Sequence, residues 1–536
     1  MLPLMVSKEK TVRYRSTQLV SHIINSLDSI DDEFYHLLKM ALLKRIRDKE
    51  PMIRVQAVLG LGRLAGNEDD GAEDGADSDD DDAGGLLVKL LEILQNDPSA
   101  DVRRSLLLNL PMTPGTLPYL LERARDLDSA TRRALYSRLL PALGDFRHLS
   151  LSMREKLLRW GLRDRDENVR KATARLFRER WIEDCAGPNA TAEDGVAGEA
   201  APPSTDGLQE LLERIDVVNS AVENGIAPEA MKEFWAGRPD YREVMQFDDA
   251  FWEHLTPEGV FVARSFNDFC RQEADGRYES LIEEKMPEVT KLAFYLQRYT
   301  NNLVECLRRN NARAEHQEEE EDTVEQEFIV EQLLHIAKTL DYSDEVGRRK
   351  TFALLRETLA IAELPDEITR LVVDVLRDVC GVEAAGERDF CGIVLEAIAE
   401  VHDNIAADEP AADNEDESFH SARSELSDST PTRENPKQSL IAESPPNGEE
   451  DEAKAIKEIM INMKCLHIAQ CMLQNVEGYL QANVHLVTML NNLVVPAVRS
   501  HEAPIRERGL LCLGLCCFLD KVSPLSPLVT KDILSH

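Results

Sequence analysis

The chain has 536 residues and a formal net charge of −37 at neutral pH. This length exceeds what one globular core usually holds, although a solenoid of stacked repeats has no such limit. The charge taken alone would exclude nucleic acid as a partner, but it is unevenly spread. Residues 1–66 with 86–181 carry 30 Lys and Arg against 19 Asp and Glu, whereas residues 182–536 carry 32 against 70. A basic arm followed by an acidic remainder is expected to bind differently from a uniformly acidic protein.

Cysteine usage and the N-terminus indicate the compartment. Ten cysteines without CxxC pairs are typical of reduced core residues in an intracellular protein. The opening sequence MLPLMVSKEK has no apolar core of signal-peptide length, and no run of about 18 apolar residues would span a bilayer. The cytosol or the nucleus is therefore expected, and no membrane partner.

The most informative pattern is an Asp followed six residues later by an Arg, with apolar or small residues at helical spacing around that Arg. The complete copies contain Asp48 and Arg54, Asp97 and Arg103, Asp126 and Arg132, and Asp164 and Arg170. Weaker copies at Arg13 and Arg506 lack the Asp. The pattern predicts antiparallel helix pairs in which the Asp accepts hydrogen bonds in the turn and the Arg lies across to a neighbouring repeat's Asp. It is similar to the HEAT repeat, whose period is about 40 residues.

Taken in order, the first part of the chain predicts an N-terminal domain of HEAT repeats over residues 1–183. Its predicted helices cover residues 11–26, 32–48, 52–65, 86–95, 101–110, 116–125, 130–140, 151–163 and 167–183. The acidic insertion NEDDGAEDGADSDDDDAGG at 67–85 cannot build a core, so a disordered loop is expected there.

The rest of the chain predicts less regular helices broken by linkers. Residues 184–207 read as a linker and 208–404 as central irregular helical repeats, with later helices at 325–340, 344–362, 366–379 and 388–403. The acidic, Ser- and Pro-rich segment 405–452 predicts disorder. Further HEAT repeats follow at 453–521, with a tail at 522–536. The predicted fold class is all-α: a HEAT-repeat α-solenoid with long disordered acidic insertions. Neither end carries a polar cap, so further chain or a partner is expected to cover the ends.

Two blocks of sequence go beyond a generic repeat. The first runs from VRYRSTQLVSHIINSL through LLKRIRDKEPMIRVQAVLGLGRL to LRDRDENVRKATARLF, and the second is LNNLVVPAVRSHEAPIRERGLLCLGLCCFLDK. From Val12 to Lys521 the chain resembles the N-terminal and central portion of the condensin subunit 3 family, the G-type HEAT subunits of condensin, whose C-terminal region would begin within 453–521.

That resemblance, and not the composition, implies a function. It implies a non-enzymatic subunit that binds the kleisin subunit of condensin and, through it, the SMC ATPase subunits. It also implies that the chain grips double-stranded DNA in a basic groove to support mitotic chromosome condensation. The expected location is the nucleus and mitotic chromosomes, with a cytoplasmic pool.

The residues around the repeat arginines supply the candidate DNA-binding site. The motif arginines themselves are predicted to be structural, since the guanidinium fork suits a carboxylate. The surplus cations beside them are the candidates, with help from helix N-terminal amides. These cations are Lys44, Arg45, Arg47, Arg104, Arg133, Arg163, Arg165 and Lys171. A solvated charged face is the plainer interpretation of each one, but as a set they predict sequence-independent, salt-sensitive binding.

Other motifs carry less weight. Thr430 and Ser444 each precede a Pro and are candidate phosphorylation sites in an accessible segment. Cys512, Cys516 and Cys517 lie on a Leu-rich stretch without a second ligand pair, which favours core packing over a metal. No catalytic, cofactor or metal motif is present, so no enzyme activity, cofactor or small-molecule substrate is expected.

Two other functions stay open at this stage. An acidic HEAT array is also typical of protein adaptors such as nuclear transport receptors or phosphatase scaffolds, which would need an acidic rather than a basic groove. An enzyme would need a pocket of converging titratable groups within the irregular stretch 208–310.

Overall fold

The computed structural model describes residues 1–27, 31–65, 85–186, 202–222, 224–272, 276–315, 321–381, 383–407 and 448–520. Within these ranges every regular element is helical, and none is a strand. The prediction of an all-α HEAT solenoid is confirmed. The chain forms two compact units: unit 1 is Met1–Phe251 with Thr256–Lys285, and unit 2 is Trp252–Leu255 with Met286–His536. None of the described helices is both long and apolar enough to cross a bilayer.

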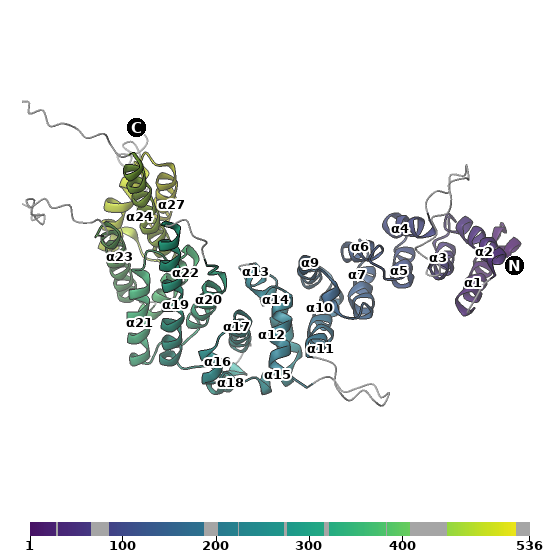
Figure 1. Cartoon of the computed structure of the whole chain (residues 1–536), viewed down its shortest axis with the longest axis horizontal. Helices are drawn as coiled ribbons and strands as arrows, with labels where there is room; N and C mark the ends of the chain where they lie inside the picture. The colour runs from purple at the N-terminus through teal and green to yellow at the C-terminus, as the bar shows by residue number, and fades with distance from the viewer. Residues whose placement is uncertain are drawn as a thin grey trace, which may run out of the picture. The chain divides into compact units, whose positions relative to one another are not determined.

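Unit 1 begins with short helix pairs that follow one another in chain order (Figure 1). The elements up to residue 186 are η1 Leu2–Val6, α1 Lys10–Ser26, α2 Asp32–Arg45, α3 Pro51–Ala65, α4 Leu86–Asn96, α5 Ala100–Asn109, α6 Leu117–Leu121, η2 Glu122–Arg125, α7 Ser129–Ala134, η3 Leu135–Leu139, α8 Leu140–Ala142, η4 Phe146–His148, α9 Leu151–Leu162, α10 Glu167–Arg175, η5 Leu176–Trp181 and α11 Ile182–Ala186. Helix α2 ends at Arg45, before the predicted limit of 48, because the chain turns at Asp48 to start α3.

The second helices of successive pairs stack on one another. Helix α1 packs on α3, α3 on α5, α5 on α7, and α7 on α10, while α2, α4 and α9 pack on their own partners. Each pair therefore buries its apolar face against its neighbours, as a solenoid requires. The close approach of α9 and α10 depends on Gly161, where a Cβ atom would lie 2.2 Å from the Thr173 hydroxyl.

Three helices contain a wide π turn that the sequence pattern did not predict: η3, η5, and η8 Leu490–Val494. Pro141 and Pro496 follow η3 and η8 within two residues. A proline offers no N–H to the turn before it, and a widened turn relieves the clash of its ring with the preceding carbonyl. No proline accompanies η5, and the structure gives no equivalent reason for it.

The remainder of unit 1 packs around aromatic side chains rather than Arg–Asp pairs. Its helices are α12 Thr205–Arg214, α13 Val217–Ser220, α14 Ala227–Gly237, α15 Pro239–Val244, α17 Pro257–Gln272 and α18 Glu279–Lys285, with α16 Asp249–Glu253 at the boundary of the units. Trp235 is fully buried, stacks edge-on against Phe266 and donates from Nε1 to the Ser265 hydroxyl at 3.0 Å. Lys285 is also buried and donates to three main-chain carbonyls at the end of α15.

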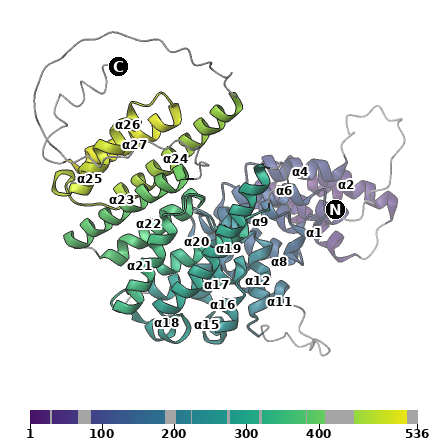
Figure 2. The same cartoon turned by 60° about the vertical axis from the view of Figure 1, so that its left-hand side comes forward.

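Unit 2 is a second stack of longer helices. They are α19 Val289–Glu315, α20 Val324–Ala337, α21 Glu345–Leu359, α22 Asp366–Cys380, α23 Ala384–Ala407, α24 Gly448–Gln474, η7 Leu480–Ala482, α25 Val484–Met489, α26 Val495–Val498 and α27 Ala503–Leu519. Figure 2 shows α21, α22, α23 and α24 side by side, each packed on the next.

Several predicted boundaries need correction or lie outside the described residues. Helix α23 runs to Ala407 and α24 starts at Gly448, so helix enters both ends of the predicted disordered segment 405–452. Helices α11 and α12 likewise enter both ends of the predicted linker 184–207. Apolar side chains of these helices pack on neighbouring helices, which outweighs the polar composition nearby. Residues 66–84, the rest of both segments, and the predicted tail 522–536 lie outside the description.

Candidate nucleic-acid interface

The recurring arginines cross from one repeat to the next, and we call these contacts the ladder. Arg54 donates from Nε to Asp97 at 2.8 Å, Arg103 to Asp126 at 2.8 Å, and Arg132 to Asp164 at 2.6 Å. In each case the second guanidinium nitrogen, NH2, donates to the other carboxylate oxygen, which makes a bidentate pair. Both members of each pair are nearly excluded from solvent.

Each ladder residue also fixes the turn of its own repeat. The third nitrogen of Arg54 donates to the carbonyl of Asp48, six residues earlier, at 2.9 Å. The carboxylate of Asp48 in turn accepts from the amide of Glu50, which leads into α3. The same two contacts recur around Asp97, Asp126 and Asp164. The six-residue spacing in the sequence is therefore the span of one turn closed by one guanidinium.

The ladder carboxylates of Asp48, Asp126 and Asp164 are held in their charged form. Burial by itself works to raise the pKa of Asp126, but hydrogen bonds from Arg103 and from the amide of Asp128 outweigh it and lower the pKa below its usual value. The same balance lowers the pKa of Asp48 and of Asp164. These pairs therefore persist across the physiological pH range.

The arginines at the ends of the ladder make some of the same contacts. Arg13, which has no Asp of its own six residues earlier, pairs with Asp48 of the next repeat at 2.9 Å. At the other end Arg170 closes its own turn onto the Asp164 carbonyl, and no described carboxylate pairs with its guanidinium. Arg506 repeats that arrangement with the carbonyls of Ser500 and His501.

Four of the eight predicted DNA-binding cations have an acidic partner. Arg45 donates to the ladder residue Asp48 at 3.1 Å and is largely buried. Arg104 pairs with Asp128 at 3.1 Å and also with Asp101. In the same way, Arg163 pairs with Glu229 and Lys171 with Glu167, both at 2.6 Å. Because their charge is already balanced, we expect these four to contribute less to phosphate binding than the sequence alone suggested.

The other four are exposed, and none has an acidic partner among the described residues. They are Lys44, Arg47, Arg133 and Arg165. Lys44 and Arg47 flank the turn between α2 and α3, and Arg165 lies in the turn between α9 and α10. Arg133 directly follows the ladder residue Arg132 on α7. All four therefore lie within four residues of a ladder position.

The sequence reasoning missed Arg123 and Arg125, although a signal was present. The turn RIRD at 45–48 recurs as RARD at 123–126. Arg123 donates to Asp126 at 3.3 Å, just as Arg45 donates to Asp48. Arg125 takes the place of Arg47, is exposed, and lies over the ring of Trp160 at 5.6 Å. We therefore add Arg125 to the candidate cations.

The expected help from helix N-termini is limited. The amide of Thr131 at the start of α7 donates to Asp128, and the amide of Asn168 at the start of α10 donates to Asp166. A carboxylate already accepts there, and its charge opposes a phosphate at the same place. The candidate phosphorylation sites Thr430 and Ser444 lie outside the described residues.

The interior of the stretch 208–310 has a cavity of about 180 Å³ between α14 and α17. Its Ser265 hydroxyl accepts from Trp235 and donates to the Val262 carbonyl. Its Asp268 carboxylate lies 3.4 Å from Arg264. These contacts tie both side chains into the packing of unit 1 rather than pairing a nucleophile with a base. In the described part of the chain no group of three or more His, Cys, Asp or Glu side chains is arranged to hold a metal ion.

Comparison with known proteins gives the family. Residues 464–526 match the family model described as nuclear condensing complex subunits, C-terminal domain. Condensin complex subunit 3 of Schizosaccharomyces pombe is 38% identical over 96% of this chain and 53% of its own length. The chain belongs to the condensin complex subunit 3 family. The Saccharomyces cerevisiae member is 31% identical over 96% of this chain and 49% of its own length.

A solved structure agrees with this assignment. The crystal structure of the S. pombe condensin Cnd3–Cnd2 subcomplex contains a chain 35% identical to this one, with a TM-score of 0.71. The match covers 97% of this chain and 57% of that one. The chain thus spans about half the length of the curated condensin relatives that it matches.

Proposed function

We propose that the chain is a non-catalytic HEAT subunit of condensin, which binds the kleisin subunit and, through it, the SMC ATPase subunits. The support for the kleisin is the likeness, over 97% of the chain, to the Cnd3 chain of a crystallised Cnd3–Cnd2 subcomplex. In this proposal residues 1–183 form the DNA-binding arm, and 208–404 with 453–521 form the later repeats. The site of action is the nucleus and the mitotic chromosome.

The second part of the proposal is that the arm holds double-stranded DNA by its phosphates. The observation that supports it is a set of exposed cations that lie within four residues of the ladder positions and have no acidic partners among the described residues. They are Lys44, Arg47, Arg125, Arg133 and Arg165. Such side chains contact the DNA backbone without reading bases, so binding is independent of sequence and weakens with salt. We propose that this grip supports mitotic chromosome condensation.

The experiment is duplex binding by the chain in complex with a kleisin fragment. Changing Lys44, Arg47, Arg125, Arg133 and Arg165 to Glu should weaken binding of a random-sequence duplex by roughly 100-fold or more at moderate salt. The matched control carries the same change of charge at exposed cations of unit 2: Arg298, Arg308, Lys457, Arg499 and Arg506. An equal loss in the control would show that only net charge matters, and unchanged binding in the first variant would remove the proposed interface.

A further inference from the structure

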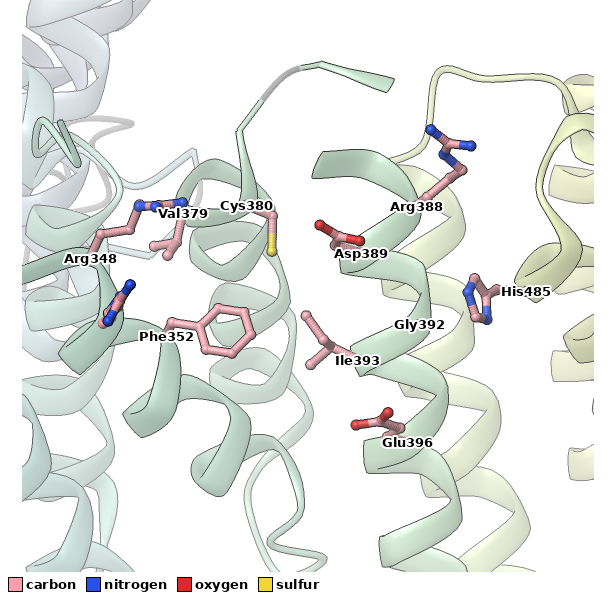
Figure 3. Close-up of a pocket in the computed structure, with 11 residues that line it drawn as sticks. Arg348, Phe352, Val379, Cys380, Arg388, Asp389, Gly392, Ile393, Glu396 and His485 are labelled. Carbon is pink, nitrogen blue, oxygen red and sulfur yellow. The ribbon is translucent and has the colours of Figure 1, made fainter. Parts of the chain in front are cut away.

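Unit 2 contains a cavity of about 530 Å³ that the proposed DNA grip does not use. It is lined by α21, the last turn of α22, α23 and the start of α25. Figure 3 shows Phe352 of α21 and Ile393 of α23 pointing toward one another across it. A cavity of this size between helices is in the range that holds several side chains of a bound peptide or a small ligand.

One part of the cavity wall is apolar. Phe352, Ile393 and the buried Val379 line it together with Cys380. Burial raises the pKa of the Cys380 thiol to about 11, so the thiol stays neutral and behaves as a small apolar group. The lack of a side chain at Gly392 keeps the α25 side open, since a Cβ atom there would lie 3.3 Å from Nε2 of His485. These surfaces suit an inserted aliphatic or aromatic side chain.

The rim carries positive charge that is only partly balanced. Arg348 has no acidic partner among the described residues, and Arg388 donates only to the carbonyl of Ala384, at 3.3 Å. Arg349 pairs with Glu345 on its own helix, and Glu396 with Arg356 at 3.5 Å. Asp389 remains, and it lies between Arg348 and Arg388 in Figure 3. Two arginines thus face one carboxylate, in a stretch of chain, 182–536, that is otherwise strongly acidic.

Exposed apolar residues lie close to the lining residues in the sequence. Val346 lies two residues before Arg348 and is 70% exposed, and Val484 directly precedes His485 and is 76% exposed. An apolar wall with separated cations at its rim suits the recognition of a peptide. A nucleic acid fits it poorly, because its uniform phosphates would meet Asp389 and Glu396.

We propose that this cavity is a docking site for a short, acidic peptide segment of a partner protein. One apolar side chain inserts between Phe352 and Ile393. Acidic residues on either side of it pair with Arg348 and Arg388, while Asp389 accepts a hydrogen bond from a main-chain amide of the peptide. The site is independent of the ladder and of DNA.

The test uses a displayed library of random 12-residue peptides, selected on the whole chain in complex with its kleisin fragment. Selected peptides should share one apolar residue flanked by Asp or Glu. Binding of a synthetic consensus peptide should fall at least tenfold in the double variant Arg348→Glu, Arg388→Glu, and remain unchanged in Arg298→Glu, a matched control on α19. A consensus rich in Lys or Arg, or one that binds both variants equally, would overturn the proposal.

A second variant separates shape from charge. Gly392→Leu should place a side chain in the hollow, and the atoms nearest to its added Cβ all belong to the exposed ring of His485, which can rotate away. Leu is also a better helix former than Gly, so the variant should fold. Loss of peptide binding with retained duplex binding and retained helical signal is the expected result. Unchanged peptide binding by this variant would place the peptide elsewhere and overturn the cavity as its site.

Discussion

The ladder repeats of unit 1 and the helices of unit 2 join stacked helices in different ways. In the ladder a buried bidentate Arg–Asp pair links each repeat to the next, and the same arginine closes the turn of its own repeat. In unit 2 the corresponding polar contact is Asp374, in the middle of α22, which accepts from Lys338, directly after α20, and from Asn475, directly after α24. The side chain of Lys338 is 45% exposed, whereas that of Arg103 in the ladder is only 9% exposed.

This difference shows how one repeat can both stabilise the fold and position residues that bind a partner. A ladder fixes the same turn in the same geometry in each repeat, so the residues next to it recur at equivalent positions. Arg47 and Arg125 share one such position, directly before a ladder Asp, and Arg133 lies at another, directly after a ladder Arg. Among the described residues of unit 2 such a turn is closed by Arg506, without a carboxylate across to a neighbouring repeat, and the cations Arg348 and Arg388, which have no described acidic partner, line a single cavity instead.

The largest expected effect comes from removing one ladder carboxylate. Asp126→Ala leaves Arg103 and Arg123 without their acceptor and should cost about 3–5 kcal/mol in the free energy of unfolding of the surrounding helices, because a buried charge is left unpaired. Asp374→Ala should cost only about 1–2 kcal/mol, since water reaches Lys338. Hydrogen exchange of the amides in α5 and α7, against those in α20 and α22, measures both. Equal losses would contradict the contrast between the units.

The next largest effect is expected in the pH dependence of the free energy of unfolding of unit 2. Lys464 of α24 donates to the carbonyl of Leu364 and the hydroxyl of Thr369, and burial lowers its pKa from 10.5 to about 8. Between these two values the unfolded chain binds more protons than the folded chain. The contribution of Lys464 to the free energy of unfolding should therefore rise with pH from about 8 to 10.5, by an amount on the order of 3 kcal/mol relative to a variant without this amine.

Lys464→Met is the matched variant for that measurement. Denaturant unfolding followed through unit 2 at pH 7, 8, 9 and 10 should show the natural chain gaining stability relative to the variant as the pH rises above 8. The buried cysteines of unit 2 are the same in both chains, so their titration cancels in this difference. A difference in stability that does not change above pH 8 would mean that Lys464 keeps its proton in the folded state.

A smaller effect tests the packing of the ladder pairs. Gly161→Ala places a methyl group against Thr173 and the ring of Tyr136 and should cost about 1–3 kcal/mol. Gly514→Ala on α27 meets nothing within 4 Å and should gain up to about 1 kcal/mol from helix propensity. Thermal unfolding of the two single variants gives the comparison. A stabilising Gly161→Ala would show that α9 and α10 lie further apart than described.

The smallest effect lies at the end of the ladder. Within the described ranges the guanidinium of Arg170 donates to the Asp164 carbonyl and has no carboxylate partner, so Arg170→Ala should cost about 1 kcal/mol. Arg132→Ala leaves the buried Asp164 unpaired and should cost several times more. The midpoints of urea unfolding of the two variants show which one loses more stability. If both variants lose the same stability, the pairs between repeats add nothing beyond closing the turn.

The sequence predicted the repeats well because the pattern that marks each ladder turn involves residues close together in the sequence. Asp and Arg six residues apart mark one turn, and helical spacing marks the buried face. The ion pairs that the sequence did not predict join residues far apart in the chain. Arg13 needs no Asp of its own because its partner is 35 residues away. Glu229, which balances the charge of Arg163, lies 66 residues away. No local pattern carries such pairs, so the division of the cations into paired and unpaired required the structure.

The most direct test of the account is the salt dependence of duplex binding. Each phosphate contact adds about −0.9 to the slope of log association constant against log salt concentration. Changing Lys44, Arg47, Arg125, Arg133 and Arg165 to Gln should therefore make the slope shallower by about 4, whereas Gln at the paired Arg104 and Lys171 should change it little. A slope that stays the same in the first variant, or falls equally in the second, would contradict a phosphate grip built on the ladder register.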